Sequence, residues 1–600
     1  MLLLRAGRAC IGALTALLGA CALAPTPVAA PPLLPEAATG YRPKAGWTTQ
    51  RFMVAAANPL AANAGYQVLK AGGHAIDAAV AVQMVLALVE PQSSGLGGGA
   101  FLVHWDGRSV EAWDGRETAP AAADEKLFLQ ADGKPMAFQE AIVGGRAVGV
   151  PGTLRMLEAA HRKHGQRPWA ELIHPAIDLA EAGFRISPRL HALLTLDAAI
   201  KDDAQARAYF LGPDGAPLPV GTLLRNPALA EVLRGIAARG SDALLTGPVA
   251  ADIVGRVRGH KTNPGLLSEA DLAGYTPKQR DAICTDWKLI YRVCGMPPPS
   301  SGHIALMQIL SLVERANPVA QQLADGLPSA GWLHSYAEAA RLAFADRALY
   351  VADPDFVAAP AGRWSSLLDD AYLRQRAALI GEQRMKSAEP GRPGGAASAF
   401  AVQAGQPEFG TTHFSIVDSQ GHALAMTSSI EFTFGARLMS DGGTGKAGGF
   451  LLNNQLSDFS MLPADAEGRP VANRLQPGKR PRSSMSPTLV FDNRDGRLVM
   501  SLGAGGGAAI IHFTAKTLLG TLDWGLDVQR AIDLPNFGNL GGPTILEKGG
   551  FPAATLAALR ARGHRVEEID INSGLQAIQR RGSGWTGGAD PRREGLAMGD

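Results

Sequence analysis

The chain has 600 residues, of which 46% are apolar and 19% are charged. A chain of this length and composition can bury a substantial core, as one large domain or two closely packed ones. Lysine and arginine number 57 against 55 aspartates and glutamates, and no basic stripe runs along the sequence. This balance removes the electrostatic basis for binding nucleic acid, so we expect no nucleic-acid partner.

The segment 1–30 has the form of a signal peptide. A positively charged start precedes an apolar stretch, 11–23, and small residues end the segment at a suitable cleavage site. The apolar stretch is short for a membrane span. Residues 18–21 also resemble a bacterial lipobox, which would place a lipid anchor at Cys21. We expect plain export instead, to the periplasm or out of the cell.

Apolar periodicity predicts the next elements in chain order. Helices are expected over 59–71, 75–89, 304–312 and 332–347, and the region 150–240 has a mainly helical pattern. The second of these helices is apolar nearly all round, so it should be buried. In the last third of the chain the pattern becomes hairpin, loop, hairpin and helix, which suits a sheet core. Patterning alone therefore supports a fold that mixes α and β structure.

Two cysteines outside the signal peptide flank what looks like the tip of a hairpin. Cys284 and Cys294 lie on either side of residues 286–290. In an exported protein, two cysteines on neighbouring strands favour a disulfide, which here would be structural. The alternative is a pair of reduced, buried thiols.

The Gly410–Thr411 bond stands at the head of an alternating segment and is suited to self-cleavage. The Thr411 hydroxyl would attack the Gly410 carbonyl, the peptide would shift to an ester, and water would release a new N-terminus. The freed threonine would hold a nucleophilic hydroxyl and an α-amine with a reference pKa near ~8, a suitable base at neutral pH. An ordinary turn that opens a strand would explain the same pair of residues.

The residues after Thr411 predict a hairpin that brings a second hydroxyl to it. A three-residue loop containing Gly421 turns the chain back, with glycine where a left-handed conformation is wanted. If the residues flanking this loop pair, Thr411 lies directly opposite Ser429, and Cβ atoms in such pairs are roughly 5 Å apart. Glu431 falls on the same face. A plain cross-strand pair of hydroxyls would explain the hairpin equally well.

Motifs along nearly the whole chain resemble those of the γ-glutamyltranspeptidases. Those of the second half are TTHFS (411–415), LNNQLSDFS (452–460), KRPRSSMSPT (479–488), GAGGG (503–507) and ADPRREG (589–595). Those of the first half are NPLA (58–61), GGHAIDAA (72–79), SSGLGGG (93–99), RETAP (116–120), VPGT (150–153) and MPPPSSG (296–302). They occur in the order that the family has, and together they are highly specific.

The resemblance implies an α+β fold of four layers, αββα, in which two stacked antiparallel sheets lie between helix layers. This is the fold of the N-terminal nucleophile hydrolases. Self-cleavage would give a large subunit, 31–410, and a small catalytic subunit, 411–600. The two should stay associated as a heterodimer, because elements of both would share one core.

A glycine loop between a predicted strand and a predicted helix offers backbone N–H groups for a negative charge. The resemblance places the oxyanion hole at Gly506 and Gly507. The spacing of Gly503, Gly505 and Ala508 also fits a dinucleotide fingerprint. That alternative fails because another helical stretch follows, where a second parallel strand is required.

The resemblance also assigns the groups that would bind a γ-glutamyl donor. Arg116 is the expected clamp for its α-carboxylate, since a planar guanidinium suits a carboxylate. Ser483 and Ser484 would share that carboxylate. Asp458 and Gln455 would hold the α-ammonium. Without the resemblance, Arg116 would be interpreted as a surface arginine paired with a neighbouring acid, and Asp458 as a loop residue or helix cap.

Two positions and one segment depart from the family pattern. Ser429 stands where threonine is common, and Glu431 where asparagine is more usual. We expect Glu431 to hold the donor ammonium and, by its charge, to raise the pKa of the Thr411 α-amine, which would shift the activity optimum upward relative to a Glu431→Gln variant. The segment 460–481 matches a lid over the site but has no aromatic residue, so acceptor choice is left open.

The resemblance implies a γ-glutamyltransferase and glutathione hydrolase. Thr411 would take the γ-glutamyl group from glutathione or a related compound and pass it to water, an amino acid or a peptide, with no cofactor. His161 and His164 share a helix face without a third ligand, so we expect no metal site. The alternatives are an acylase of the same fold that acts on glutaryl-type amides, against which Asp458 argues, and an uncleaved exported binding protein.

Overall fold

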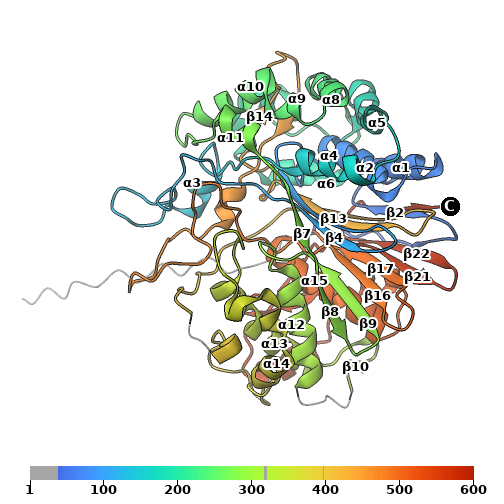
Figure 1. The fold of residues 1–600 in the computed structure, drawn as a ribbon, viewed down its shortest axis with the longest axis vertical. Helices are drawn as coiled ribbons and strands as arrows, with labels where there is room; N and C mark the ends of the chain where they lie inside the picture. Colours follow the sequence, from blue (N-terminus) through green and yellow to red (C-terminus); the bar gives the residue numbers. More distant parts are fainter. Residues whose placement is uncertain (1–37, 317–320, 396–397) are drawn as a thin grey trace, which may run out of the picture. The chain divides into compact units, whose positions relative to one another are not determined.

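Two seven-stranded antiparallel sheets lie face to face at the centre of the molecule, with helices on both outer faces (Figure 1). The first sheet has the order β1 (Trp47–Thr49), β22 (Gly584–Ala589), β21 (Gln576–Arg581), β17 (Leu498–Gly503), β16 (Thr488–Asp492), β9 (Tyr291–Gly295), β8 (Ile283–Trp287). The second has the order β23 (Leu596–Gly599), β2 (Met53–Ala56), β12 (Thr412–Val417), β13 (Ala423–Ser429), β3 (Gly99–Trp105), β4 (Val110–Gly115), β7 (Lys278–Asp281).

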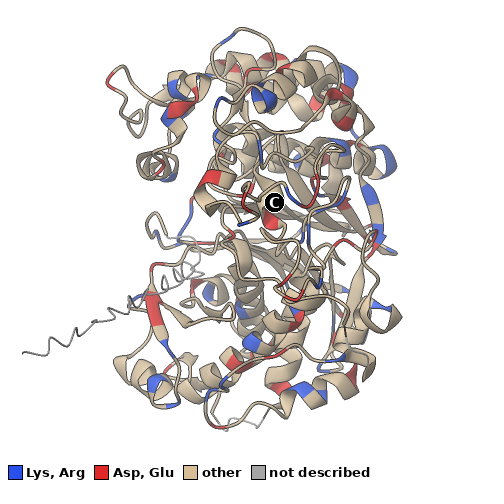
Figure 2. Ribbon diagram, turned by 90° about the vertical axis from the view of Figure 1, so that its left-hand side faces the viewer, with Lys and Arg blue, Asp and Glu red and all other residues tan. Residues whose placement is uncertain are grey.

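The computed structural model describes residues 38–316, 321–395 and 398–600. The predicted signal peptide, with Cys21, lies outside the described residues. Among the helices that are described, none is long and apolar enough to cross a membrane. In the view of Figure 2, lysines and arginines are interspersed with aspartates and glutamates.

Helices cover both sheets, as the four-layer arrangement requires. Over the second sheet lie α1 (Pro59–Lys70), α2 (Ala75–Val89), α4 (Thr153–His164), α5 (Trp169–Ala182) and α8 (Pro227–Arg239). Over the first lie α12 (Gly302–Arg315), α13 (Ala330–Tyr350) and α15 (Ile510–Leu518). The predicted helices are all present, and every residue of α2 is buried, as its uniformly apolar sequence predicts.

Alternation along the central strands divides the core into two parts. On β2, Val54 and Ala56 face the helices over the second sheet, whereas Met53 and Ala55 face the space between the two sheets. This follows from the two-residue period of a strand. Both faces of this sheet are therefore buried, which accounts for the continuous apolar runs in its sequence.

The hairpin of β12 and β13 has the predicted register. The Asp418 N–H donates to the His422 carbonyl at 3.0 Å, and Gly421 has a φ of 86° in the loop between the strands. The pairing continues through Thr412 opposite Ser428. Elsewhere, Cys284 and Cys294 are a cross-strand pair on β8 and β9 and are joined by a disulfide.

Candidate active site

Thr411 lies immediately before β12, with its hydroxyl against that of Ser429. Its Oγ1 donates to Ser429 Oγ at 3.2 Å, and Ser429 Oγ also accepts from the backbone N–H of Glu431 at 2.8 Å. Both hydroxyl-bearing residues are buried. Thr411 has a φ of 85°, which is rare for a β-branched residue and costs on the order of 1–3 kcal/mol. Cleavage of the bond before Thr411 would release this constraint.

The glycine loop after β17 contacts the carbonyl that precedes Thr411. The Gly506 N–H donates to the Gly410 carbonyl oxygen at 2.8 Å, so it polarises the bond that self-cleavage would break. A Cβ added to Gly507 would lie 1.9 Å from the Glu408 carbonyl oxygen, so only glycine fits there. In the uncut chain the segment 408–410 therefore occupies the space against this loop. Because β17 is antiparallel to both its neighbours, the loop is not part of a dinucleotide-binding unit.

The residues predicted to bind the α-amino acid end of a donor come together in one buried cluster. Arg116 has no exposed surface and donates to the Asp458 carboxylate and to the Pro481 carbonyl. Gln455 Nε2 donates to Glu431 at 3.0 Å and to Asp458 at 3.3 Å. Arg116 is thus not a surface arginine, although its other neighbour Glu117 lies 3.5 Å away.

This cluster contains several buried polar atoms without a hydrogen-bond partner among the described residues. They are Arg116 Nη1, Asp458 Oδ1, Gln455 Oε1 and Glu431 Oε1. Unpartnered buried groups of this kind cost about 1–3 kcal/mol each, so a group of four calls for an explanation. Three of these atoms are acceptors, which an ammonium would satisfy, and Arg116 Nη1, which has only the ion pair with Glu117 at 3.5 Å, can donate to a carboxylate.

The pKa of Glu431 is raised by its surroundings in this cluster. Burial raises its pKa well above the ordinary value, and the nearby Asp458 and Glu408 raise it further. Burial also raises the pKa of Asp458, although Arg116 opposes this. The expected effect of Glu431 on the Thr411 amine depends on its ionisation, which the departure of Glu408 and the arrival of an ammonium would both favour.

The side chains of Ser483 and Ser484, the two serines predicted to bind a donor carboxylate, form hydrogen bonds to groups other than Arg116. Ser484 Oγ donates to the Glu408 carboxylate at 2.7 Å and accepts from Arg347 at 2.7 Å. Ser483 Oγ accepts from the Met485 N–H at 3.2 Å. In the uncut chain, the serine predicted to bind a donor carboxylate thus binds a carboxylate that belongs to the protein.

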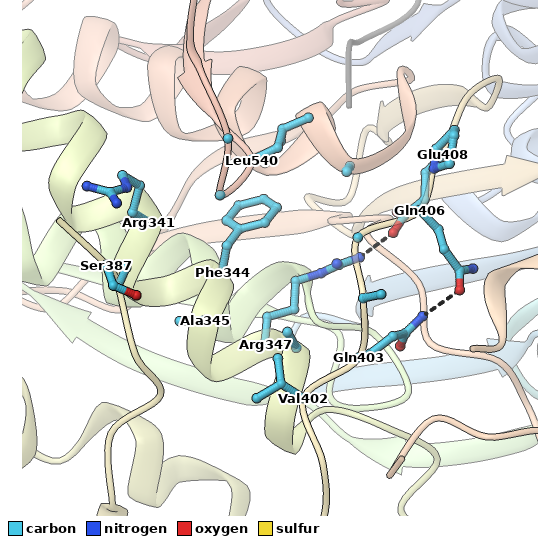
Figure 3. A pocket seen from close by; sticks show the side chains of 18 of the residues that line it. Arg341, Phe344, Ala345, Arg347, Ser387, Val402, Gln403, Gln406, Glu408 and Leu540 are labelled. Carbon is cyan, nitrogen blue, oxygen red and sulfur yellow. Dashed lines mark hydrogen bonds and ion pairs between the residues drawn. The ribbon is translucent and has the colours of Figure 1, made fainter. Parts of the chain in front are cut away.

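Sequence reasoning missed the partners of that carboxylate and one further cation. Arg347, on α13, donates to Glu408 at 2.6 Å (Figure 3), and Arg482 lies close enough to act on it electrostatically. Arg593 donates to the Thr411 carbonyl at 2.7 Å. Glu408 could have been noticed because it precedes the cut by only three residues. Nothing local in the sequence indicates that Arg347 or Arg593 would reach the same place.

A group able to hold a metal ion lies elsewhere, on β3, β4 and α4. His104, Glu111 and His164 offer ligand atoms within 4.8 Å of one another. The sequence gives no sign of these further ligands beside His164, because His104 and Glu111 are a cross-strand pair that the sheet brings there. Lys163 donates to the same Glu111 carboxylate, and its charge opposes a bound cation. His161 is held by Asp77 and the Arg167 carbonyl instead.

A threonine hydroxyl at the head of a central strand, beside two stacked antiparallel sheets, is the arrangement that defines the N-terminal nucleophile hydrolases. The family model described as gamma-glutamyltranspeptidase matches residues 61–600. The chain belongs to the gamma-glutamyltranspeptidase family.

The chain is similar both to proteins named glutathione hydrolase and to proteins named acylase. The glutathione hydrolase proenzyme of Bacillus subtilis is 36% identical over 561 residues, which cover 91% of each chain. The acylase ACY 1 proenzyme of a Pseudomonas species is 34% identical over 95% of this chain and 97% of its own. Among solved structures, the cephalosporin acylase of Bacillus halodurans superposes with a TM-score of 0.78 at 27% identity, over 93% of this chain and 97% of its own.

Proposed function

We propose that the protein is a self-processing γ-glutamyltransferase and glutathione hydrolase that transfers the γ-glutamyl group of glutathione or a related amide. The observation that carries this proposal is the buried set of unpartnered atoms on Arg116, Asp458, Gln455 and Glu431. A γ-glutamyl donor presents the carboxylate and the ammonium that these atoms lack. Relatives named glutathione hydrolase support the same assignment.

The first chemical step is the formation of an ester on the free N-terminal threonine. Its α-amine takes the proton of Thr411 Oγ1 as the oxygen attacks the γ-amide carbon of the donor. Gly506 and Gly507 would hold the oxyanion, and such donors contribute roughly 3–4 kcal/mol in other enzymes. The α-ammonium then gives the proton to the leaving amine as the carbon–nitrogen bond breaks.

The second step returns the threonine to its starting state. Water, or the amine of an amino acid or peptide, loses a proton to the Thr411 α-amine and attacks the ester carbon. The carbon–oxygen bond breaks, Thr411 Oγ1 recovers a proton, and glutamate or a new γ-glutamyl amide departs. Ser429 Oγ orients the hydroxyl in both steps, from its 3.2 Å hydrogen bond in the uncut chain.

The mature protein would be a heterodimer of residues 31–410 and 411–600. The relatives are named as proenzymes, which supports processing. Strands on both sides of the proposed cut lie next to one another in each sheet, so the pieces would remain associated. From the form of the segment 1–30 we infer export to the periplasm or medium, with a lipid anchor at Cys21 as the alternative.

The first test measures processing. The exported protein and its Thr411→Ala variant are purified, and intact masses and N-terminal sequences are determined. We expect two fragments for the natural protein, the smaller beginning Thr-Thr-His-Phe, and one uncut chain for the variant. Two uncut chains that are folded would overturn the proposal in favour of a binding protein.

A second candidate, an acylase for glutaryl-type amides, is favoured by the similarity to two acylases. A glutaryl group has a carboxylate but no α-ammonium, so it would leave Asp458 and Glu431 unpaired. Turnover of a γ-glutamyl anilide is therefore compared with that of the glutaryl anilide. A kcat/KM that favours the glutaryl compound would replace the proposed function with this candidate.

A further inference from the structure

Five of the chain's 13 histidines gather where α2 and α4 lie side by side over the second sheet (Figure 1). They are His74, His104, His161, His164 and His422. The ring centroids of His74 and His422 are 4.9 Å apart, and those of His104 and His164 are 4.5 Å apart. His104 is also close enough to His74 and His422 to interact with them electrostatically. Imidazole is the side chain that proteins use most often to bind metal ions, so this corner was searched for a complete ligand set.

Two of these histidines form such a set with the carboxylate of Asp418. His74, Asp418 and His422 offer one ligand atom each, and the three atoms all lie within 4.8 Å of one another. His422 Nδ1 is 3.0 Å from Asp418 Oδ2. Two ligands of one tetrahedral zinc ion, each about 2.0–2.1 Å from the metal, are about 3.3 Å apart. The group is therefore already close to the spacing that a metal ion requires.

Asp418, in the loop between β12 and β13, is held in one orientation by backbone groups. Its Oδ1 accepts from the N–H groups of Gln420 and His422 at 2.9 and 3.0 Å, and its Oδ2 accepts from the Ala75 N–H at 3.1 Å. Hydrogen bonds of this kind orient the ligating carboxylates of metal sites. The Gln420 amide lies 2.8 Å from His74 Nε2 and carries an oxygen that can serve as a fourth ligand.

The charges around Asp418 favour a cation more than those around the neighbouring Glu111. No lysine or arginine pairs with Asp418 in the part of the chain that the structure describes, whereas Lys163 donates to Glu111. The positive N-terminal end of α2 contacts two carboxylates, Asp77 and Asp418, which offset its charge. The His422 side chain is partly exposed, so an ion has a path of entry from solvent.

We propose that His74, Asp418 and His422 bind a divalent transition-metal ion, for which zinc is the best match, with Gln420 or water as the fourth ligand. Two imidazoles and one carboxylate suit zinc, whereas calcium and magnesium take oxygen ligands. The ion would replace the proton between His422 Nδ1 and Asp418. This site goes beyond the proposed function and does not depend on it. The sequence pattern does not reveal it, because its ligands come from the start of α2 and from a distant loop.

The site would be structural, because the length of β12 separates it from the chemistry. Thr411 directly precedes this strand of six residues and Asp418 directly follows it, so they are roughly 20 Å apart. If the chain is cut before Thr411, His74 belongs to the large piece, whereas Asp418 and His422 belong to the small one. A bound ion would then link the two pieces at the far end of the hairpin that carries Thr411.

The test uses Zn²⁺ alone as the probe. The natural protein, cut or uncut as it is isolated, is freed of metal with a chelator, and Zn²⁺ binding is measured by isothermal titration calorimetry. We expect one ion per molecule and a melting temperature that rises with Zn²⁺, because an ion that binds only the folded protein stabilises it. Hydrolysis of a γ-glutamyl anilide should be equal with and without the ion. Absence of saturable Zn²⁺ binding would overturn the inference and leave the proposed function intact.

Substitutions then identify the ligands. His422→Asn should weaken Zn²⁺ binding by at least about tenfold, since even the hydrogen-bond partners of metal ligands are worth 10- to 100-fold. His174→Asn, at an exposed histidine on α5, is the matched control and should bind Zn²⁺ like the natural protein. Binding that is unchanged in His422→Asn, or that is lost in Glu111→Gln instead, would contradict the assignment. If His422→Asn does not fold, His74→Asn decides the same question from the other side of the site.

Discussion

The site has two regions, one around Arg116 and one around Arg347, that contain the same kinds of side chain. They differ in how many of their buried polar atoms have a hydrogen-bond partner within the protein. Around Arg116, carboxyl and amide groups retain unpartnered buried atoms. Around Arg347, the Glu408 carboxylate and Ser484 complete a compact set of hydrogen bonds. The difference shows that the uncut chain supplies its own ligand to one region and leaves the other prepared for a ligand from outside.

The largest expected effect on cleavage and activity comes from removing the Thr411 hydroxyl, which lies beside both regions. Thr411→Ala should abolish self-cleavage and lower activity by at least roughly 1000-fold, because no other hydroxyl and α-amine stand at that position. Thr411→Ser is the matched control and should still be cut. Intact mass measures cleavage, and hydrolysis of a γ-glutamyl anilide measures activity. Cleavage in the alanine variant would show that the Thr411 hydroxyl is not the nucleophile.

A large effect on kcat/KM is also expected from a substitution in the region around Arg116. Asp458→Asn should lower kcat/KM for a γ-glutamyl anilide by roughly 10- to 100-fold, as expected for losing about 1.5–3 kcal/mol of hydrogen bonding to a charged group. Asp465→Asn, at a partly exposed lid carboxylate paired with Arg469, serves as control. Since Arg116 also loses its counter-ion, thermal unfolding of both variants is measured beside activity. Equal kinetics for the two variants would contradict an ammonium site at Asp458.

A moderate effect on the rate of self-cleavage is expected from a substitution in the region around Arg347, where Glu408 is the ligand. Glu408→Gln should slow self-cleavage by about tenfold, because the segment before the cut loses a charged anchor on Arg347. The accumulation of fragments is followed by gel or mass spectrometry, with Glu389→Gln as the control from the same stretch of chain. Equal cleavage rates in the two variants would show that the anchor plays no part.

The pH dependence of this anchor has a definite sign. Burial alone would raise the pKa of Glu408, but Arg347 and Arg482 together hold it below its ordinary value of 4.5. The stabilisation from the anchor is thus fully present above pH 4.5 and is lost as the pH falls through the lower folded-state pKa. Self-cleavage of the natural protein should therefore be insensitive to Glu408 protonation across the neutral range.

The smallest expected effect concerns Glu431, at the edge of the first region. Its raised pKa means that the carboxylate forms only as the pH rises, whereas a glutamine never ionises. The advantage of the natural enzyme over Glu431→Gln should grow with pH, and its activity optimum should lie higher. Two pH–rate profiles for the same donor measure this. Superimposable profiles, or a shift to lower pH, would refute the prediction.

Local pattern and family resemblance predicted the first region well. The three-residue loop with Gly421 fixes the hairpin register, and the register alone brings Ser429 opposite Thr411. The motif around Asp458 and the position of Arg116 indicated that they would meet, and the structure places them together. These relations either are local or follow a pattern that the family shares.

The second region could not be predicted in the same way. Arg347 comes from a helix, Glu408 from the stretch before the cut, and Arg482 and Ser484 from a loop that follows the lid. Periodicity shows which face of α13 is buried, but not which distant charge pairs with Arg347. Ser484, which the resemblance assigns to a donor carboxylate, binds the Glu408 carboxylate in the uncut chain.

The position of β12 in its sheet has a consequence for the lifetime of the processed enzyme. If the chain is cut before Thr411, β12 and β13 belong to the small piece, and they pair with β2 and β3 of the large one on either side. Separating the pieces would require the hydrogen bonds of β12 to β2 and of β13 to β3 to break together. The buried core on each face of the sheet would have to open as well. The heterodimer should therefore persist for as long as the fold itself does, so differently labelled enzymes mixed after processing should not exchange their halves.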